Sequence, residues 1–228
     1  MLYNIDLHIH TSVSNCFKSR GYPEDKINQA IMERSGEKKL NMIAITDHYS
    51  VKNFLEIKKL ADKKNIVVLP GIELSIKTHL PEKVSILAIF DENTDPDWIE
   101  MEILSKLNVP FNFFGDGSFL IEKSITDVIP FLKRNNILVI SSHQDKNDSR
   151  LSYIPTLIDC GVHFFDLRYP DKKEEFMHIY GAKNVFPLTF SDAHNVNDVG
   201  KYLMTLPLVS PSLDGLKKYL YSELDNKQ

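Results

Sequence analysis

The first residues of the chain, Met1–Thr11, read MLYNIDLHIHT, an apolar run that ends in two histidines one residue apart. Side chains alternate along an extended segment, so His8 and His10 are expected to project to the same side. A pair of imidazoles at the end of a strand can bind a single metal ion. The stretch therefore predicts a buried strand that ends in two metal ligands. Apolar runs followed by polar residues recur along the rest of the chain.

Short apolar runs alternate with longer polar segments that have helical period. The predicted strands are Leu2–His8, Met42–Thr46, Ile66–Leu69, Val84–Phe90, Ile137–Ser141, His163–Leu167 and Val185–Phe190. The predicted helices are Glu24–Lys39, Val51–Lys64, Trp98–Leu107, Ile125–Asn135, Leu151–Cys160, Lys172–Tyr180 and Leu213–Leu224. Near-continuous apolar strands are typical of parallel strands covered on both faces. The alternation indicates βαβ units and an α/β fold, and it leaves a closed barrel and an open doubly wound sheet as alternatives.

Polar residues able to bind metal follow five of the predicted strands. These strand ends are Asp6–Thr11, Thr46–His48, Gly71–Glu73, Ser141–His143 and Ser191–His194. In parallel α/β proteins the loops at that edge hold the active site, so these side chains are expected to meet. Imidazole and carboxylate donors suit Zn²⁺, Mn²⁺ or Fe²⁺, and a carboxylate such as Glu73 can bridge two ions.

Composition limits the possible classes of protein. The chain has 228 residues, 43% hydrophobic and 25% charged, and no linker divides it, so we expect one domain over residues 1–228. The net charge of −4 argues against broad affinity for nucleic acid. Cys16 and Cys160 show no disulfide framework spacing, which favours free thiols. With no signal peptide and no apolar run long enough to cross a membrane, we expect a soluble cytoplasmic protein.

Four of the motifs together resemble the polymerase and histidinol phosphatase (PHP) superfamily of metal-dependent phosphoesterases. They are Asp6–Thr11 (DLHIHT), Ile45–His48 (ITDH), Pro70–Glu73 (PGIE) and Ser191–His194 (SDAH). The resemblance covers nearly the whole chain. It implies a distorted (β/α)7 barrel, similar to a TIM barrel, with one to three divalent ions, Mn, Zn or Fe, at the C-terminal edge of its strands.

The resemblance also implies a set of metal ligands: His8, His10, His48, Glu73, His143, Asp192 and His194. Asp6 and Asp47 lie beside ligands, and we expect them to orient imidazoles, although Asp47 could equally cap the following helix. Two positions depart from the family pattern. Asn15 stands where the family has an aspartate ligand, and Ser85 where it has a histidine. These departures put the second and third ions in doubt.

The motif set predicts hydrolysis of a phosphate ester by a metal-activated water, because no serine, cysteine or lysine nucleophile is evident. The expected substrate is a small phosphorylated metabolite or nucleotide, and Arg168 is a candidate clamp for its phosphate. One alternative is a nuclease module acting on nucleic acid. The stretch Val84–Asp91 and the ending Ser191–Gly200 resemble PHP modules that precede ATPase domains in some bacterial proteins. The chain has no phosphate-binding Walker loop, so an ATPase, if one belongs to it, is expected to be a separate partner. The other is a degenerate domain with a binding or structural role, for which Asn15 and Ser85 argue.

Overall fold

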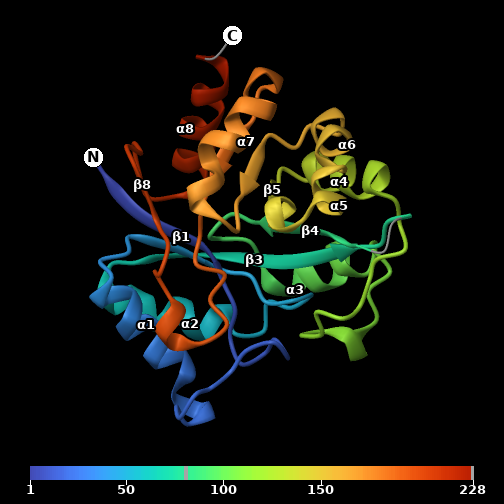
Figure 1. Cartoon of the computed structure of the whole chain (residues 1–228). Helices are drawn as coiled ribbons and strands as arrows, with labels where there is room; N and C mark the ends of the chain where they lie inside the picture. Colours follow the sequence, from blue (N-terminus) through green and yellow to red (C-terminus); the bar gives the residue numbers. More distant parts are fainter. Residues whose placement is uncertain (80–81, 227–228) are drawn as a thin grey trace.

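The computed structural model describes residues 1–79 and 82–226, which form helices around one curved sheet (Figure 1). The strands are β1 (Tyr3–Ile9), β2 (Met42–Ile45), β3 (Val67–Ile76), β4 (Val84–Ile89), β5 (Leu138–Ser142), β6 (Phe164–Asp166), β7 (Phe186–Leu188) and β8 (Met204–Leu206). The helices are α1 (Ile27–Glu37), α2 (Phe54–Ala61), α3 (Pro96–Trp98), α4 (Ile125–Arg134), α5 (Asp148–Leu151), α6 (Ile154–Asp159), α7 (Lys173–Tyr180) and α8 (Leu213–Asp225). Single turns join several of them, and α3 continues into a π-helical segment, η3 (Ile99–Leu104).

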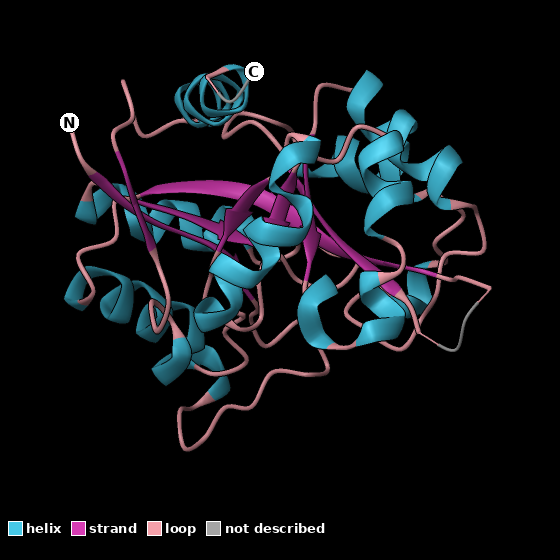
Figure 2. Ribbon diagram, turned by 45° about the horizontal axis from the view of Figure 1, so that its top comes forward, coloured by secondary structure: helices cyan, strands magenta, loops and turns pink. Residues whose placement is uncertain are grey.

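The eight strands follow the order β7-β6-β5-β4-β3-β2-β1-β8. The sheet nearly closes on itself because the chain after β7 reaches β1. His10 N donates to Ala193 O at 3.0 Å, and Ala193 N donates to His8 O at 3.1 Å. Helices lie around the strands of the sheet (Figure 2), and α1 and α2 pack against each other on one side of it (Figure 1). The predicted α/β fold class, a distorted TIM-like barrel, is confirmed.

Two details of the strand prediction were wrong. β4 pairs antiparallel with both β3 and β5, although its apolar sequence was interpreted as a parallel strand. β8, which was not predicted, pairs antiparallel with β1 at the edge of the sheet. An apolar run reports burial on both faces and carries no information on strand direction, which the short connection from Ile76 to Val84 sets instead.

The barrel interior is filled by apolar side chains from the starts of the strands. Ile5, Met42, Leu138 and Phe164 belong to this buried cluster, together with the apolar face of α8. Because this packing occupies the end at which the strands begin, the polar strand ends are left to form the opposite end of the barrel. Among the described residues, no helix has the length and apolar character needed to cross a membrane.

Candidate metal centre

All seven residues predicted to bind metal lie together at the C-terminal ends of the strands. His8 and His10 come from the end of β1, His48 follows β2, and Glu73 lies within β3. The other three are His143 after β5, and Asp192 and His194 after β7. Six of the seven side chains are at most 11% exposed, whereas the side chain of His194 is 37% exposed.

Two carboxylates occupy the middle of the cluster. Glu73 Oε2 lies 3.7 Å from His8 Nε2, 3.3 Å from His10 Nε2 and 3.4 Å from His48 Nδ1. The second carboxylate overlaps this set from the other side. Asp192 Oδ1 lies 3.3 Å from His8 Nε2, 3.6 Å from His10 Nε2 and 3.5 Å from His194 Nε2. One oxygen of each carboxylate therefore faces several ring nitrogens at once.

His143 joins the cluster from the side of β5 and β6. Its Nδ1 lies 3.7 Å from Asp192 Oδ2, and its ring stacks on that of His8 with centroids 5.2 Å apart. His143 and Asp192 both have left-handed backbones, with φ of 56° and 47°. A non-glycine residue in this region is strained, and such strain is common where side chains are held for function.

The donor atoms of this cluster fit divalent metal ions. His8 Nε2, His10 Nε2 and His48 Nδ1 are buried and have no hydrogen-bond partner among the residues the structure describes. A buried polar atom without a partner is costly, and a bound cation would remove that cost. Metal–nitrogen bonds of about 2.1 Å place two donors of a tetrahedral ion about 3.4 Å apart, close to the observed spacings.

Hydrogen bonds to the other ring nitrogens fix the tautomers. His8 Nδ1 lies 2.9 Å from Asp166 Oδ2, and a carboxylate accepts, so Nδ1–H donates and Nε2 keeps its lone pair. Ser14 Oγ donates its hydrogen to Asp47 Oδ1 at 2.6 Å and lies 3.2 Å from His10 Nδ1. His10 Nδ1–H then donates to Ser14, which leaves its Nε2 free as well.

The roles predicted for Asp6 and Asp47 need correction. Asp6 accepts backbone N–H groups of Ser191 at 3.1 Å and Gly200 at 3.0 Å, so it holds the loop after β7 and no imidazole. Asp47 accepts from Thr11 and Ser14, and it orients His10 only through Ser14. Asp47 does not cap α2 either, because that helix begins at Phe54.

Asp166 is the residue that orients His8 directly, and sequence analysis did not assign it that role. It is fully buried, and its other oxygen accepts the N–H of Phe190 at 3.0 Å. The available signal was a carboxylate at the end of an apolar run, Phe164-Phe165-Asp166, at the same edge as the other motifs.

The carboxylates and imidazoles of the cluster shift each other's pKa values strongly. Burial lowers the pKa of His8, but Asp192, Asp166 and Glu73 outweigh burial and raise that pKa to about 10. Burial raises the pKa of Glu73, but His10, His8 and His48 outweigh it and hold that pKa well below its usual range. Carboxylates that draw protons onto imidazoles also attract a metal cation, which competes with those protons.

The two departures from the family pattern lie at the edge of the same cluster. Asn15 turns its side chain toward the loop after η4 (Phe111–Phe113), where its Nδ2 donates to Asp116 Oδ1 at 2.8 Å. Ser85 lies on β4 and is buried. Cys16, which follows Asn15 in the sequence, lies close to His10 and His194, although it was predicted only as a free thiol.

A polar cleft of about 440 Å³ opens over the metal centre. Four basic residues line it: Lys83, Lys146, Arg150 and Arg168. Arg168 Nη1 donates to Asp192 Oδ2 at 2.7 Å, and its side chain remains 46% exposed. Arg150, whose side chain is buried, instead pairs with the partly exposed Glu82, at 3.2 Å, so it is held in place by the protein itself.

The loop after η4 forms one wall of this cleft. Gly115 N donates to His48 O at 2.7 Å, and Lys83 Nζ donates to Gly117 O at 2.9 Å. Gly117 packs on the His48 ring so closely that a Cβ at this position would lie 2.5 Å from His48 Nε2. The aromatic segment Phe111–Phe119 thus contacts the site through its glycines, while Phe119 packs edge-on against Tyr49.

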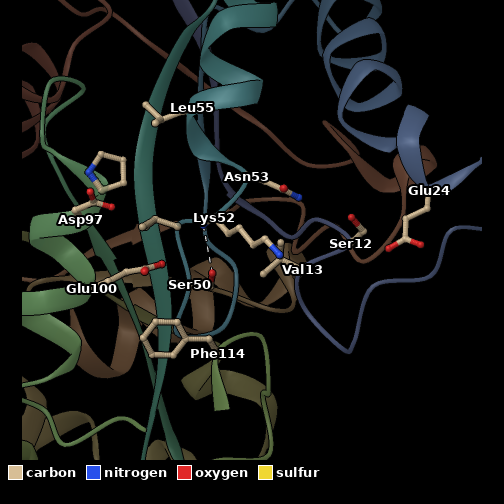
Figure 3. Close-up of a pocket in the computed structure, with 12 residues that line it drawn as sticks. Ser12, Val13, Glu24, Ser50, Lys52, Asn53, Leu55, Asp97, Glu100 and Phe114 are labelled. Carbon is tan, nitrogen blue, oxygen red and sulfur yellow. Dashed lines mark hydrogen bonds between the residues drawn. The ribbon is translucent and has the colours of Figure 1, made fainter. Parts of the chain in front are cut away.

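A larger cavity, of about 670 Å³, lies beside the cleft and contains none of the seven residues. Figure 3 shows Lys52, Asn53, Glu100 and Phe114 around it. Asn53 Nδ2 donates to Thr11 Oγ1 at 2.8 Å, and Thr11 Oγ1 donates to Asp47, so hydrogen bonds link this cavity to the residues beside the metal centre. Size alone would therefore select a space that lacks the buried donors required for metal chemistry.

The PHP domain family model matches residues 6–154. No curated protein sequence matches the chain. Among solved structures, a protein assigned as a metal-dependent phosphoesterase from Bifidobacterium adolescentis is similar, with a TM-score of 0.59, 16% identity and 95% of each chain covered. An amidohydrolase from Chromobacterium violaceum has a TM-score of 0.63 at 14% identity, with 98% and 96% covered.

A lesion-specific endonuclease from Pyrococcus furiosus is also similar, with a TM-score of 0.72 and 17% identity. The alignment covers 97% of this chain, which spans 56% of the endonuclease. At these identities the three likenesses show a common fold.

Proposed function

The chain belongs to the PHP domain family of metal-dependent phosphoesterases, and on that premise we propose that it hydrolyses phosphate monoesters of small metabolites or nucleotides. The proposed ligands of its divalent ions, one to three of Mn, Zn or Fe, are His8, His10, His48, Glu73, His143, Asp192 and His194. The observation that carries the proposal is their convergence, with three buried ring nitrogens left unpartnered among the described residues.

The protein's own side chains prepare the site for this reaction. Glu73 and Asp192 each face three imidazoles with a single oxygen, which is the arrangement expected of carboxylates that bridge or share ions. Asp166 and Ser14 hold the imidazoles of His8 and His10 in the tautomer that leaves Nε2 free. When bound, divalent ions supply positive charge to the phosphoryl oxygens and make water acidic enough to attack at neutral pH.

Basic residues on the rim of the cleft support a phosphate substrate. Arg168 is anchored by Asp192 yet keeps donors exposed, so it can bind phosphoryl oxygens while staying in register with the metal centre. Lys83 and Lys146 line the same cleft. A cleft of about 440 Å³ has the size of sites that enclose a small ligand.

A phosphodiester in nucleic acid is the second candidate substrate. The similarity to the Pyrococcus endonuclease favours it, but that enzyme is longer and this chain has a net charge of −4. Sequence-independent binding to nucleic acid depends on many phosphate contacts, for which four basic residues around one cleft are few. A separate ATPase partner and a cytoplasmic location stay predictions. The degenerate alternative is not favoured, because the buried donors are retained.

The test is hydrolysis of a generic phosphomonoester and a generic phosphodiester, side by side, with Mn²⁺ or Zn²⁺. We expect faster turnover of the monoester and its loss in His8→Ala and His10→Ala proteins. Preference for the diester would assign the nuclease activity instead. Equal metal-dependent turnover by the variants and the wild type would contradict the proposed centre.

A further inference from the structure

The segment after the two histidines of β1 differs from the family pattern, and the structure shows how the chain accommodates the change. Both polar atoms of the Asn15 side chain are used by the neighbouring loop. Its Nδ2 donates to Asp116, and its Oδ1 accepts from Gly117 N at 3.3 Å. Asn15 therefore braces the wall of the cleft and turns away from the imidazoles.

Cys16 takes the place beside the imidazoles that Asn15 leaves. Its Sγ and ring nitrogens of His10 and His194 all lie within 4.8 Å of one another. The loop is fixed in this position because Lys18 N donates to His194 O at 2.7 Å and Asn15 N donates to Gly115 O at 2.8 Å. Cys16 is partly buried and lines the cleft, so an ion entering the cleft can reach it.

A second observation, independent of the thiol, points to a ligand at the same place. His10 is fully buried, and its Nε2 has no hydrogen-bond partner among residues 1–79 and 82–226. Its ring stacks on that of His194, with centroids 4.8 Å apart and planes inclined by 27°. Two imidazoles and a thiol thus gather around one point, next to Glu73 Oε2 at 3.3 Å from His10 Nε2 and Asp192 Oδ1 at 3.5 Å from His194 Nε2.

We propose that Cys16 is a metal ligand that acts with His194, beside His10, and makes this side of the centre selective for Zn²⁺ over Mn²⁺. The proposal rests on the proposed function and specifies one of its metal positions. Thiolate is a soft ligand that favours zinc, whereas Mn²⁺ prefers carboxylate and water oxygens. The thiol releases its proton to solvent as the sulfur–metal bond forms.

Sulfur ligation predicts a spectrum that nitrogen and oxygen ligands do not produce. The metal-free protein is loaded with Co²⁺, whose visible bands report binding and whose near-ultraviolet thiolate charge-transfer band reports sulfur. We expect both signals in the wild type and in Cys160→Ser, which keeps the first thiol. In Cys16→Ser the visible bands should remain and the charge-transfer band should disappear.

Two measurements support the spectra. Zn²⁺ should protect Cys16 from alkylation by iodoacetamide and leave Cys160 reactive. In Cys16→Asp, which supplies a carboxylate at this position, the ratio of Zn²⁺ to Mn²⁺ affinity should fall by about tenfold or more. Circular dichroism of the variants establishes that they are folded before metal is added.

The outcomes separate this inference from the proposed function. Bound Co²⁺ without a charge-transfer band in the wild type, or a band that persists in Cys16→Ser, would overturn the role of Cys16 and leave the metal centre standing. A wild-type protein that binds neither Co²⁺ nor Zn²⁺ would overturn both. An unchanged ratio of Zn²⁺ to Mn²⁺ affinity in Cys16→Asp would refute the claim that Cys16 causes the preference for Zn²⁺.

Discussion

The two sides of the metal centre are built differently. The anchored side consists of His8, His10, Asp166 and Asp192, of which the first three are fully buried. The loop side consists of Cys16, His48, Gly117 and His194, where one imidazole is 37% exposed and the position of another depends on a glycine. The family's ligand pattern is intact on the anchored side and altered on the loop side. A buried ligand that is also fixed by a hydrogen bond tolerates few other residues at its position, whereas a ligand on a loop can be replaced by another residue type.

The largest effect is expected where the two sides meet, at Glu73. Its Oε2 faces imidazoles of both sides, at 3.3 Å from His10 and 3.4 Å from His48. Glu73→Gln removes the negative charge, so both sides should bind metal poorly. Hydrolysis should fall by more than the roughly 100-fold typical of losing an outer partner of a ligand. Metal analysis and turnover are measured against Glu122→Gln, an exposed control, and a variant that retains its metal would refute the shared role.

Asp166→Asn tests the anchored side alone. The amide can still accept from His8 Nδ1–H but carries no charge, so His8 becomes a weaker ligand. We expect a loss of about 10- to 100-fold in metal affinity and in turnover, with little change in KM. Isothermal titration with Zn²⁺ measures the affinity, and Asp171→Asn, at an exposed position nearby, serves as the control. Equal affinities in the two variants would mean that Asp166 has only a packing role.

Gly117→Ala tests the loop side. The added methyl group would lie 2.5 Å from His48 Nε2, so either the ring or the loop must move. Binding at the loop side should weaken by about tenfold, while the ion held by His8 and His10 remains. Gly36→Ala is the matched control, because its methyl group would meet only Lys64 at ordinary contact distances. Loss of all metal in Gly117→Ala would show that the sides are not independent.

The smallest effect is expected at Arg168, on the exposed rim. Arg168→Lys keeps the positive charge and loses the planar fork that can bind two phosphoryl oxygens. KM for a phosphomonoester should rise by about tenfold or less with kcat nearly unchanged. Steady-state kinetics check this, with Arg134→Lys on the exposed face of α4 as the control. A fall in kcat at constant KM would place Arg168 in the chemical step instead.

The same contrast explains how far the sequence could be interpreted. His8 and His10 were predictable because strand alternation fixes their direction, and the recurrence of polar strand ends predicted where they would meet. Asp166 and Cys16 belong to no local motif, and their partners lie far away in the sequence, at positions 8 and 194. Their roles arise only when the sheet curves and the segment at 14–18 packs on the loops at 115–117 and 194.

The direction of β4 could not be predicted from its sequence for a related reason. The run at 84–89 is buried on both faces, as a parallel strand would be, so its composition matches its neighbours. Its reversal follows from the short β3–β4 connection, whose described residues, 77–79 and 82–83, form no helix. Short connections between apolar runs are the available signal for an antiparallel pair.

The central claim is that the strand ends hold divalent ions through these side chains, and anomalous diffraction from Zn²⁺-soaked crystals tests it most directly. The account predicts a peak within bonding distance of His8 Nε2, His10 Nε2 and the carboxylates of Glu73 and Asp192. It predicts another peak beside Cys16 and His194. Anomalous peaks confined to the molecular surface, with these side chains unliganded, would contradict it.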